Sequence, residues 1–429
     1  MCVRCGNLAV VMNSAAQLPA HRSATAVQGW VLVSCGWLAV MASAMLSPVL
    51  PRMTAHFQQQ PSVDLLISLV ASLPALFVAL LAWPFGILGD RIGHKRVLFW
   101  GTVVYGAVGT APVWLKTLPQ IVVSRGLVGV AEAAIMTCST TLIGDYFRTE
   151  RRRRYLALQT GTAPLMAMTV VALGGALGES SWRAPFLAYG FAFALVPLTG
   201  LLLWKPERNI AAATPAPSGS RTVAPLSAQS PQRFRWGKLL LICGVTLFAM
   251  TAFLITVIQM GFVLTERGLD SPAKIGFWQS LASLANPLGA LTFGLSRSRA
   301  LPKVAVCFLL LGAGFFVIAL LPGWHSAVMG AVIANYGAGM ILPTLITWAI
   351  TSLPAAQRGT GTGLWMAASF LGQFLSPLAV LALRHLTGSL SGAILVYAVA
   401  CGAGGLLALT CVLLSRHRGT LPTPSPPAD

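Results

Sequence analysis

Charged residues are scarce in this chain of 429 residues. Only 9% of the residues are Asp, Glu, Lys or Arg, whereas 56% are hydrophobic and the mean hydropathy is +0.75. A water-soluble fold needs charged side chains over its surface, at about a quarter of its residues. The composition therefore excludes an ordinary soluble enzyme and indicates a polytopic membrane protein.

Acidic residues are rarer than basic ones. Ten Asp and Glu stand against 29 Lys and Arg, which gives a formal net charge of +19. Nucleic-acid-binding proteins carry such an excess on a charged, soluble surface, so we expect no nucleic acid partner. In a polytopic membrane protein the same excess marks the cytoplasmic loops.

The chain also lacks the short motifs of metal and nucleotide chemistry. It has no H-E-x-x-H pair and no G-x-x-x-x-G-K loop, and its six histidines lie at or beyond the ends of apolar runs. Six of the eight cysteines lie inside apolar runs, and Cys2 and Cys5 form a lone C-x-x-C pair. We therefore expect no enzyme, no metal site and no cofactor.

Long apolar runs, by contrast, are abundant. A helix needs about 20 apolar residues to cross a bilayer, and the sequence contains twelve such segments, six on each side of a stretch rich in Pro, Ser, Ala and Arg. The predicted spans are 29–50, 64–87, 97–115, 119–143, 155–178, 184–204, 238–263, 273–295, 302–322, 326–350, 360–383 and 390–414.

The predicted fold is an all-α polytopic membrane protein of two six-helix bundles. Both halves have a short basic loop after their second helix, which suggests repeats related by a pseudo-two-fold axis, with a site between them at the midplane. The expected parts are an N-terminal tail (1–28), a first bundle (29–204), a cytoplasmic linker (205–236), a second bundle (237–415) and a C-terminal tail (416–429).

The basic residues predict the orientation. If both termini are cytoplasmic, 22 of the 29 Lys and Arg fall in cytoplasmic segments, six fall in outer loops, and Arg125 lies within a span. Cytoplasmic loops carry the excess of Lys and Arg in membrane proteins. We therefore expect both termini in the cytoplasm and the protein in the plasma membrane, which is the inner membrane in a bacterium.

The loop after the second span carries a motif. Residues 86–96 read GILGDRIGHKR, which resembles the signature G-x-L-x-D-R-x-G-x-(K/R)-(K/R) found at this place in the major facilitator superfamily (MFS) of transporters. Gly86 and Gly93 permit close helix approach and a tight turn. Asp90 can accept hydrogen bonds from the exposed N–H groups at the start of a helix of the other half.

The resemblance implies a conformational gate at the cytoplasmic face. In the family, the acid of this motif contacts the start of the eleventh helix, here near Thr360, while the cavity faces outward, and the contact breaks in the inward state. The end of the fourth helix resembles the family's partner in this charge network. The predicted gate residues are Gly86, Asp90, Arg91, Gly93, Lys95, Arg96, Asp145 and Arg152.

Two charged residues, Arg125 and Glu132, lie deep in the fourth predicted span. Each costs on the order of 3 kcal/mol or more in lipid, so both are expected to face the protein interior. They are seven residues apart, about 10 Å along the helix, so a direct ion pair is not expected. Arg125, Gly129 and Ala133 resemble the MFS fourth-helix motif R-x-x-x-G-x-x-x-A, which the family links to proton transfer, whereas Glu132 is not a residue of that motif.

Three roles stay open for these two charged residues. Glu132 carries a proton between the two access states, or it is a structural carboxylate, or one of the two residues pairs with a charged substrate. Polar residues in other spans are candidates for substrate contact or for hydrogen bonds between helices. These residues are Gln159, Gln259, Gln279, Asn286, Asn335, Tyr336 and Gln373.

The leading function is secondary active transport by alternating access. We expect proton-coupled export of a small organic molecule by a monomer in the lipid bilayer, as in the drug and metabolite efflux permeases that the chain resembles. Drug antiporters of the superfamily carry a Gly-Pro pair in the fifth helix, where this chain has Val170 and Val171. Proton-coupled uptake of an organic acid with Arg125 as anion anchor, an uncoupled facilitator, and a receptor or channel are the alternatives.

Overall fold

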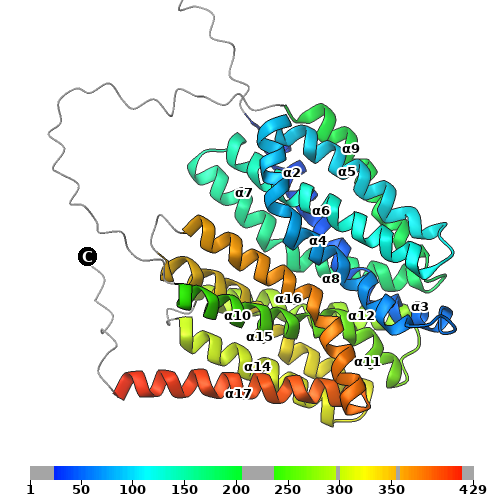
Figure 1. Ribbon diagram of the computed structural model, residues 1–429, viewed down its shortest axis with the longest axis vertical. Coiled ribbons are helices and arrows are strands. Elements are labelled where there is room, and N and C mark those ends of the chain that lie inside the picture. Colours follow the sequence, from blue (N-terminus) through cyan, green and yellow to red (C-terminus); the bar gives the residue numbers. More distant parts are fainter. Residues whose placement is uncertain (1–23, 205–235, 296–299, 354–357, 418–429) are drawn as a thin grey trace, which may run out of the picture.

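The protein folds into helices that gather in two groups (Figure 1). The computed structural model describes residues 24–204, 236–295, 300–353 and 358–417, and these residues contain no β-strand. The predicted N-terminal tail, linker and C-terminal tail lie largely outside the described residues. Helices α2–α9 form the upper group in Figure 1, and helices α10–α17 form the lower one.

The first half contains six helical passes, several of which consist of consecutive segments. The α7–α8 break precedes Pro164, which lacks the N–H that a continuous helix requires. The segments are α2 (Ala26–Ala44), η1 (Ser47–Val49) and α3 (Leu50–His56); α4 (Val63–Ile92); α5 (His94–Thr110) and η2 (Ala111–Val113); α6 (Leu118–Tyr146); α7 (Thr149–Gly161) and α8 (Ala163–Gly178); η3 (Ala184–Gly190) and α9 (Phe191–Leu202).

The second half repeats this arrangement. Pro287 interrupts the helix at the predicted place, because its ring excludes the carbonyl of Ser283, the last residue of α12. The segments are α10 (Trp236–Leu254), a π-helical turn (Ile255–Gln259) and α11 (Met260–Glu266); α12 (Pro272–Ser283) and α13 (Ala285–Leu295); α14 (Ala300–Leu320); α15 (Trp324–Ser352); α16 (Arg358–Thr387); α17 (Leu390–His417).

Ten helices in the described part of the chain are long and apolar enough to cross a membrane, when consecutive segments are joined. The other two predicted spans are also helical. One is α5, whose 17 residues begin with a charged His-Lys-Arg run, and the other is the interrupted pair α12–α13. Each of the twelve predicted spans therefore corresponds to a helical pass.

Each half has its own hydrophobic core, and glycines set the closest approaches within it. A Cβ atom on Gly129 of α6 would lie 2.6 Å from Cα of Pro74 and 3.0 Å from Cβ of Phe77, both on α4. Interiors are packed too densely to absorb such an overlap. The α4–α6 contact therefore depends on a residue without a side chain at position 129.

The two ends of the bundle are named here by their chain connections. The linker end is where α4 ends at Ile92, α9 ends at Leu202 and α10 begins at Trp236, and it lies to the left in Figure 1. The far end is the opposite one, where α3 ends and α12 begins.

Two seams join the halves, one between α8 and α12 and the other between α4 and α16.

Replacement of Gly129 by Ala tests the α4–α6 contact. We expect Gly129→Ala to lower the apparent unfolding temperature of the purified protein, since overpacking costs about 1–3 kcal/mol. Gly161→Ala is the matched control, because a Cβ atom there meets nothing within 4 Å. Equal unfolding temperatures for the two variants would contradict this account of the packing.

Candidate functional site

A cavity of about 370 Å³ lies between the two halves. Its lining comes from the C-terminal ends of α2 and α10, from the π-helical turn and from the central parts of α4, α6, α15 and α16, together with residues on both sides of the α7–α8 and α12–α13 breaks. Its wall is mostly apolar, with many alanines and with the rings of Phe253 and Phe370 contributed by the second half. Such a wall suits an organic molecule with a largely apolar body.

Polar groups are few on this wall. Four predicted residues are among them, Glu132 from the first half and Asn286, Asn335 and Gln373 from the second. Asn335 donates one hydrogen bond to the carbonyl of Ala331, one turn earlier in α15 (2.9 Å). Four small hydroxyl side chains that the sequence analysis missed also line the cavity, namely Ser43, Ser72, Thr160 and Ser283.

Glu132 is the one ionisable side chain among the described residues that line the cavity. The residue is only 4% exposed, and its Oε2 atom has no hydrogen-bond partner within the described chain. A charged carboxylate in apolar surroundings is costly, whereas the protonated form is much less so. Glu132 therefore has the surroundings of a group that gains and loses a proton.

Arg125 is placed quite differently, because it lies outside the cavity lining in the core of the first half and is fully buried. Its Nε atom donates to the carbonyl of Val70 (3.2 Å), and one terminal nitrogen donates to the carbonyl of Ala42 (2.5 Å). Its guanidinium also lies 5.1 Å from the ring centroid of Tyr189.

Both carbonyls that Arg125 binds lack the usual helical donor. The partner of Val70 would be the N–H of residue 74, which is Pro74, and Ala42 lies in the last turn of α2. A buried carbonyl without a donor is costly. Arg125 therefore has a structural role in this state, and the proposed roles in proton transfer or anion binding find no support in its position.

A double-mutant cycle tests the link between Arg125 and Pro74. Arg125→Met is expected to lower the apparent unfolding temperature, because two carbonyls lose their donor. In a Pro74→Ala background the loss should be smaller, since residue 74 then supplies its own N–H to Val70. Coupled residues show interaction energies of about 0.5–3 kcal/mol. An equal loss in both backgrounds would show that the proline and the arginine act independently.

The other predicted cavity residues lie elsewhere. Gln159 connects α7 to α6, where its amide donates to Oγ of Ser139 (3.2 Å). Tyr336 is half-buried against the core of the second half, and Gln259 lines a separate pocket at the far end. In this state they are therefore helix contacts or pocket residues, outside the cavity lining.

Gln279 joins the two halves at the far end. Its amide donates to Oγ of Ser47 in the first half (2.8 Å) and to the carbonyl of Val257 (2.6 Å). Val257 belongs to the π-helical turn, where the regular helical hydrogen-bond pattern is shifted. One buried amide thus satisfies an irregular backbone and holds the halves together.

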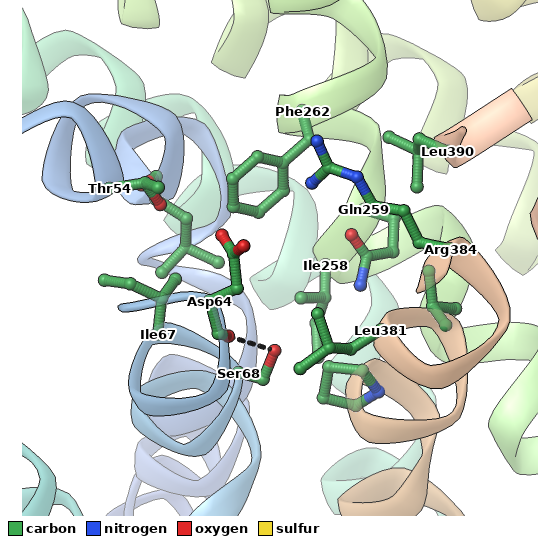
Figure 2. Close-up of a pocket in the computed structure, with 13 residues that line it drawn as sticks. Thr54, Asp64, Ile67, Ser68, Ile258, Gln259, Phe262, Leu381, Arg384 and Leu390 are labelled. Atoms are coloured by element: carbon green, nitrogen blue, oxygen red, sulfur yellow. Dashed lines mark hydrogen bonds between the residues drawn. The ribbon is translucent and has the colours of Figure 1, made fainter. Parts of the chain in front are cut away.

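A second, smaller pocket of about 40 Å³ lies at the far end of the α4–α16 seam. Figure 2 shows Asp64 on α4 and Arg384 on α16 entering it from opposite halves, with the amide of Gln259 nearby. Arg384 also lies 3.9 Å from Glu266. At the far end of this seam the two halves therefore leave only a small space between them.

The central cavity is accessible from the linker end. Thr160 and Leu342 line it on that side, about ten residues from the linker ends of their helices, and both are exposed, Leu342 by 37%. The structure therefore represents a state with the far end closed and the cavity facing the linker end.

The predicted gate residues gather at the linker end. Gly93 has a φ of +98°, which glycine alone adopts without strain, so the predicted tight turn is present. Lys95 donates to the carbonyl of Gly200 near the end of α9 (2.8 Å), and the carboxylate of Asp90 lies 4.0 Å from His94.

The remaining gate residues surround this turn. Arg91, Arg96, Asp145 and Arg152 are exposed, Gly86 approaches Thr137 of α6, and the guanidinium of Arg152 lies over Gly144. The contact expected between Asp90 and the start of α16 falls next to residues 354–357, which lie outside the described residues. That contact stays a prediction.

Two six-helix bundles around a central cavity define a membrane transport protein. The sequence model of the Major Facilitator Superfamily matches residues 32–377. The chain therefore belongs to this superfamily of transporters.

Relatives in bacteria support this assignment. The chain is 25% identical to the 3-(3-hydroxy-phenyl)propionate transporter of Escherichia coli strain K12, over 68% of this chain and 71% of that protein. It is 23% identical to the multidrug resistance protein MdtM of Escherichia coli O157:H7, over 78% and 81% of the two chains.

Solved structures share the fold. A bacterial homologue of the human lysosomal transporter Spinster, in an inward-facing and unoccupied conformation, superposes with a TM-score of 0.73 at 16% identity, over 94% of this chain and all of that one. The inward-open xylose transporter XylE of E. coli gives a TM-score of 0.71 at 13% identity, over 89% and 94%.

Proposed function

We propose that this transporter exports a small, largely apolar organic molecule in exchange for protons, and that Glu132 carries the proton. The observation that carries the proposal is the position of Glu132, a buried carboxyl group on the wall of an apolar cavity between the two halves, whose Oε2 atom has no hydrogen-bond partner within the described chain. An exchanger needs one group whose charge changes while its access alternates between the two sides. Among the described lining residues, Glu132 has that property.

The exchange follows from the cost of a buried charge. When the cavity opens to the outside, a proton neutralises Glu132 and substrate leaves. When it opens to the cytoplasm, water reaches the carboxylate, the proton leaves and substrate enters. The switch with a proton in place is cheap, because no bare carboxylate is then enclosed in an apolar cavity. For the switch with substrate in place, the proposal requires a hydrogen-bond donor or a positive charge on the substrate that meets the carboxylate.

The proposed direction places the linker end in the cytoplasm. Of the 29 Lys and Arg, 22 belong to segments that the sequence analysis assigns to that side, as the positive-inside rule requires. With this orientation the structure is an inward-facing state that receives substrate from the cytoplasm, and both termini are cytoplasmic.

The wall of the cavity favours an apolar substrate over an organic acid. A relative is named as a transporter of 3-(3-hydroxy-phenyl)propionate, which supports the uptake of an aromatic acid. A cation is the strongest anchor for an acid, however, and the described lining residues include none, because Arg125 binds the carbonyls of Val70 and Ala42 outside the cavity. The multidrug relatives support export.

A Glu132→Gln variant in proteoliposomes tests the proposal. A substrate is first found by thermal-shift screening of the purified protein against metabolites and drugs. We expect Glu132→Gln to keep substrate binding and exchange but to lose accumulation driven by a pH gradient, because its side chain cannot titrate. Glu132→Asp is the matched control and should keep coupling. If the Gln variant accumulates substrate as wild type does under the same gradient, Glu132 does not carry the proton.

Fusions to the C-terminus test the orientation. With the linker end in the cytoplasm, green fluorescent protein fused after Asp429 should fluoresce, whereas alkaline phosphatase at the same position should be inactive in bacterial cells. The opposite pattern, with active phosphatase and no fluorescence, would place the cavity of this structure on the outer side.

A further inference from the structure

The far end of the α8–α12 seam is closed by a carboxylate that reaches from one half to the other. Glu179, the residue after α8, accepts hydrogen bonds from the hydroxyl of Ser271 (2.9 Å) and the backbone N–H of Ala273 (3.2 Å). Ser271 is the N-cap of α12 and Pro272 has no N–H, so Ala273 supplies the first free donor of that helix. The carboxylate of one half thus caps a helix of the other.

The surroundings of Glu179 keep its carboxylate charged. Its hydrogen bonds from Ala273 and Ser271 hold the pKa of Glu179 below its usual range, and the charges of Arg52 and Lys274 add to this effect. Arg52 of α3 lies 3.6 Å from the carboxylate and also donates to the backbone carbonyl of Glu179 (3.0 Å). Because the pKa is lowered, the contact is present at neutral pH and weakens only as the pH falls through that lowered value.

The second seam carries a related arrangement with the charges exchanged. Arg384 lies in the last turn of α16, and Asp64 lies in the first turn of α4. Both face the small far-end pocket, from opposite halves (Figure 2). A cation has no favourable interaction with the positive N-terminal end of a helix, and Arg384 has negative charge nearby on Asp64 across the pocket and on Glu266 of its own half, 3.9 Å away.

The two seams are equivalent under the pseudo-two-fold axis. Helices α8 and α16 end the fifth pass of their halves, and α12 and α4 begin the second pass of the other half. Glu179 and Arg384 therefore occupy corresponding positions, and each faces the start of a second-pass helix. The two helices also pack closely at the α8–α12 seam, since a Cβ atom on Gly276 would lie 2.9 Å from Cα of Gly175.

We propose that Glu179 on one seam and Arg384, which faces Asp64 across the small pocket of the other seam, form two corresponding latches that hold the far end closed and so favour the linker-open state. Glu179 is hydrogen-bonded to the other half and Arg384 faces a carboxylate of the other half, so both arrangements separate when the far end opens. The latches go beyond the proposed export function, because they require alternation between the two ends but no particular substrate, direction or coupling ion.

Hydrogen–deuterium exchange of the purified, full-length protein tests the latches without a substrate. The variants are Glu179→Gln and Arg384→Gln, checked for folding by size-exclusion chromatography. Asp270→Asn is the matched control, since it removes an exposed carboxylate beside the α12 N-cap but lies in the same half as that helix. Neither variant alters Glu132. A result that contradicts the latches would therefore leave the proposal of proton exchange by Glu132 untouched.

Each latch variant should shift the balance between the two states. We expect exchange to rise about three- to tenfold, as for the loss of a capping contact, in the far-end segment that holds no ion-pair partner of the replaced residue. This segment is 260–266 for Glu179→Gln, because Arg52 lies in 47–56, and it is 47–56 for Arg384→Gln, because Glu266 lies in 260–266. Exchange should fall in the linker-end segments 86–92 and 142–147, which become buried as that end closes. Asp270→Asn should leave all four segments at wild-type rates.

Two results would overturn the proposal. Faster exchange confined to residues 271–275 in Glu179→Gln would show a local cap without influence on the far end. Wild-type exchange in all four segments in both latch variants would show that packing alone keeps the far end closed.

Discussion

Backbone polar groups in a membrane have no water to bind, and this constraint shapes the interior of the transporter. The helices are interrupted around the central cavity, and each interruption leaves a carbonyl that needs a donor. Arg125 supplies donors to Val70 and Ala42, and Gln279 supplies one to Val257. In both cases a buried polar side chain forms hydrogen bonds with carbonyl groups of the protein's own backbone.

Glu132 stands out against this background. It lies on the same helix as Arg125 and shares its burial, but it lines the cavity between the halves, whereas Arg125 donates to two carbonyls of the first half. In the proposed mechanism a single helix therefore supplies one structural charge and one group that changes its protonation.

The fold was largely predictable from the sequence, and the site was only partly so. Apolar length alone located all twelve passes, and the Asn286-Pro287 break appeared where proline chemistry requires it. Membership of the superfamily followed from the motif at residues 86–96. Each of these features belongs to a short stretch of sequence, so it can be recognised without knowledge of the fold.

Contacts between distant segments could not be predicted in this way. Gln279 and Glu132 are both polar residues in apolar runs, and only the fold shows that one binds Ser47 and the other faces the cavity. Glu179 and Ser271 are 92 residues apart, and nothing in either local sequence indicates that they meet. The direction in which a helix faces, and the carbonyls that its breaks release, decide these roles.

Infrared difference spectroscopy of the purified protein during a pH titration tests the central claim most directly. The account predicts a carboxylic acid band that disappears as the pH rises and that is missing in Glu132→Gln. If wild type and Glu132→Gln give the same carboxyl bands across the pH range in which the protein stays folded, Glu132 keeps one protonation state and the account is wrong.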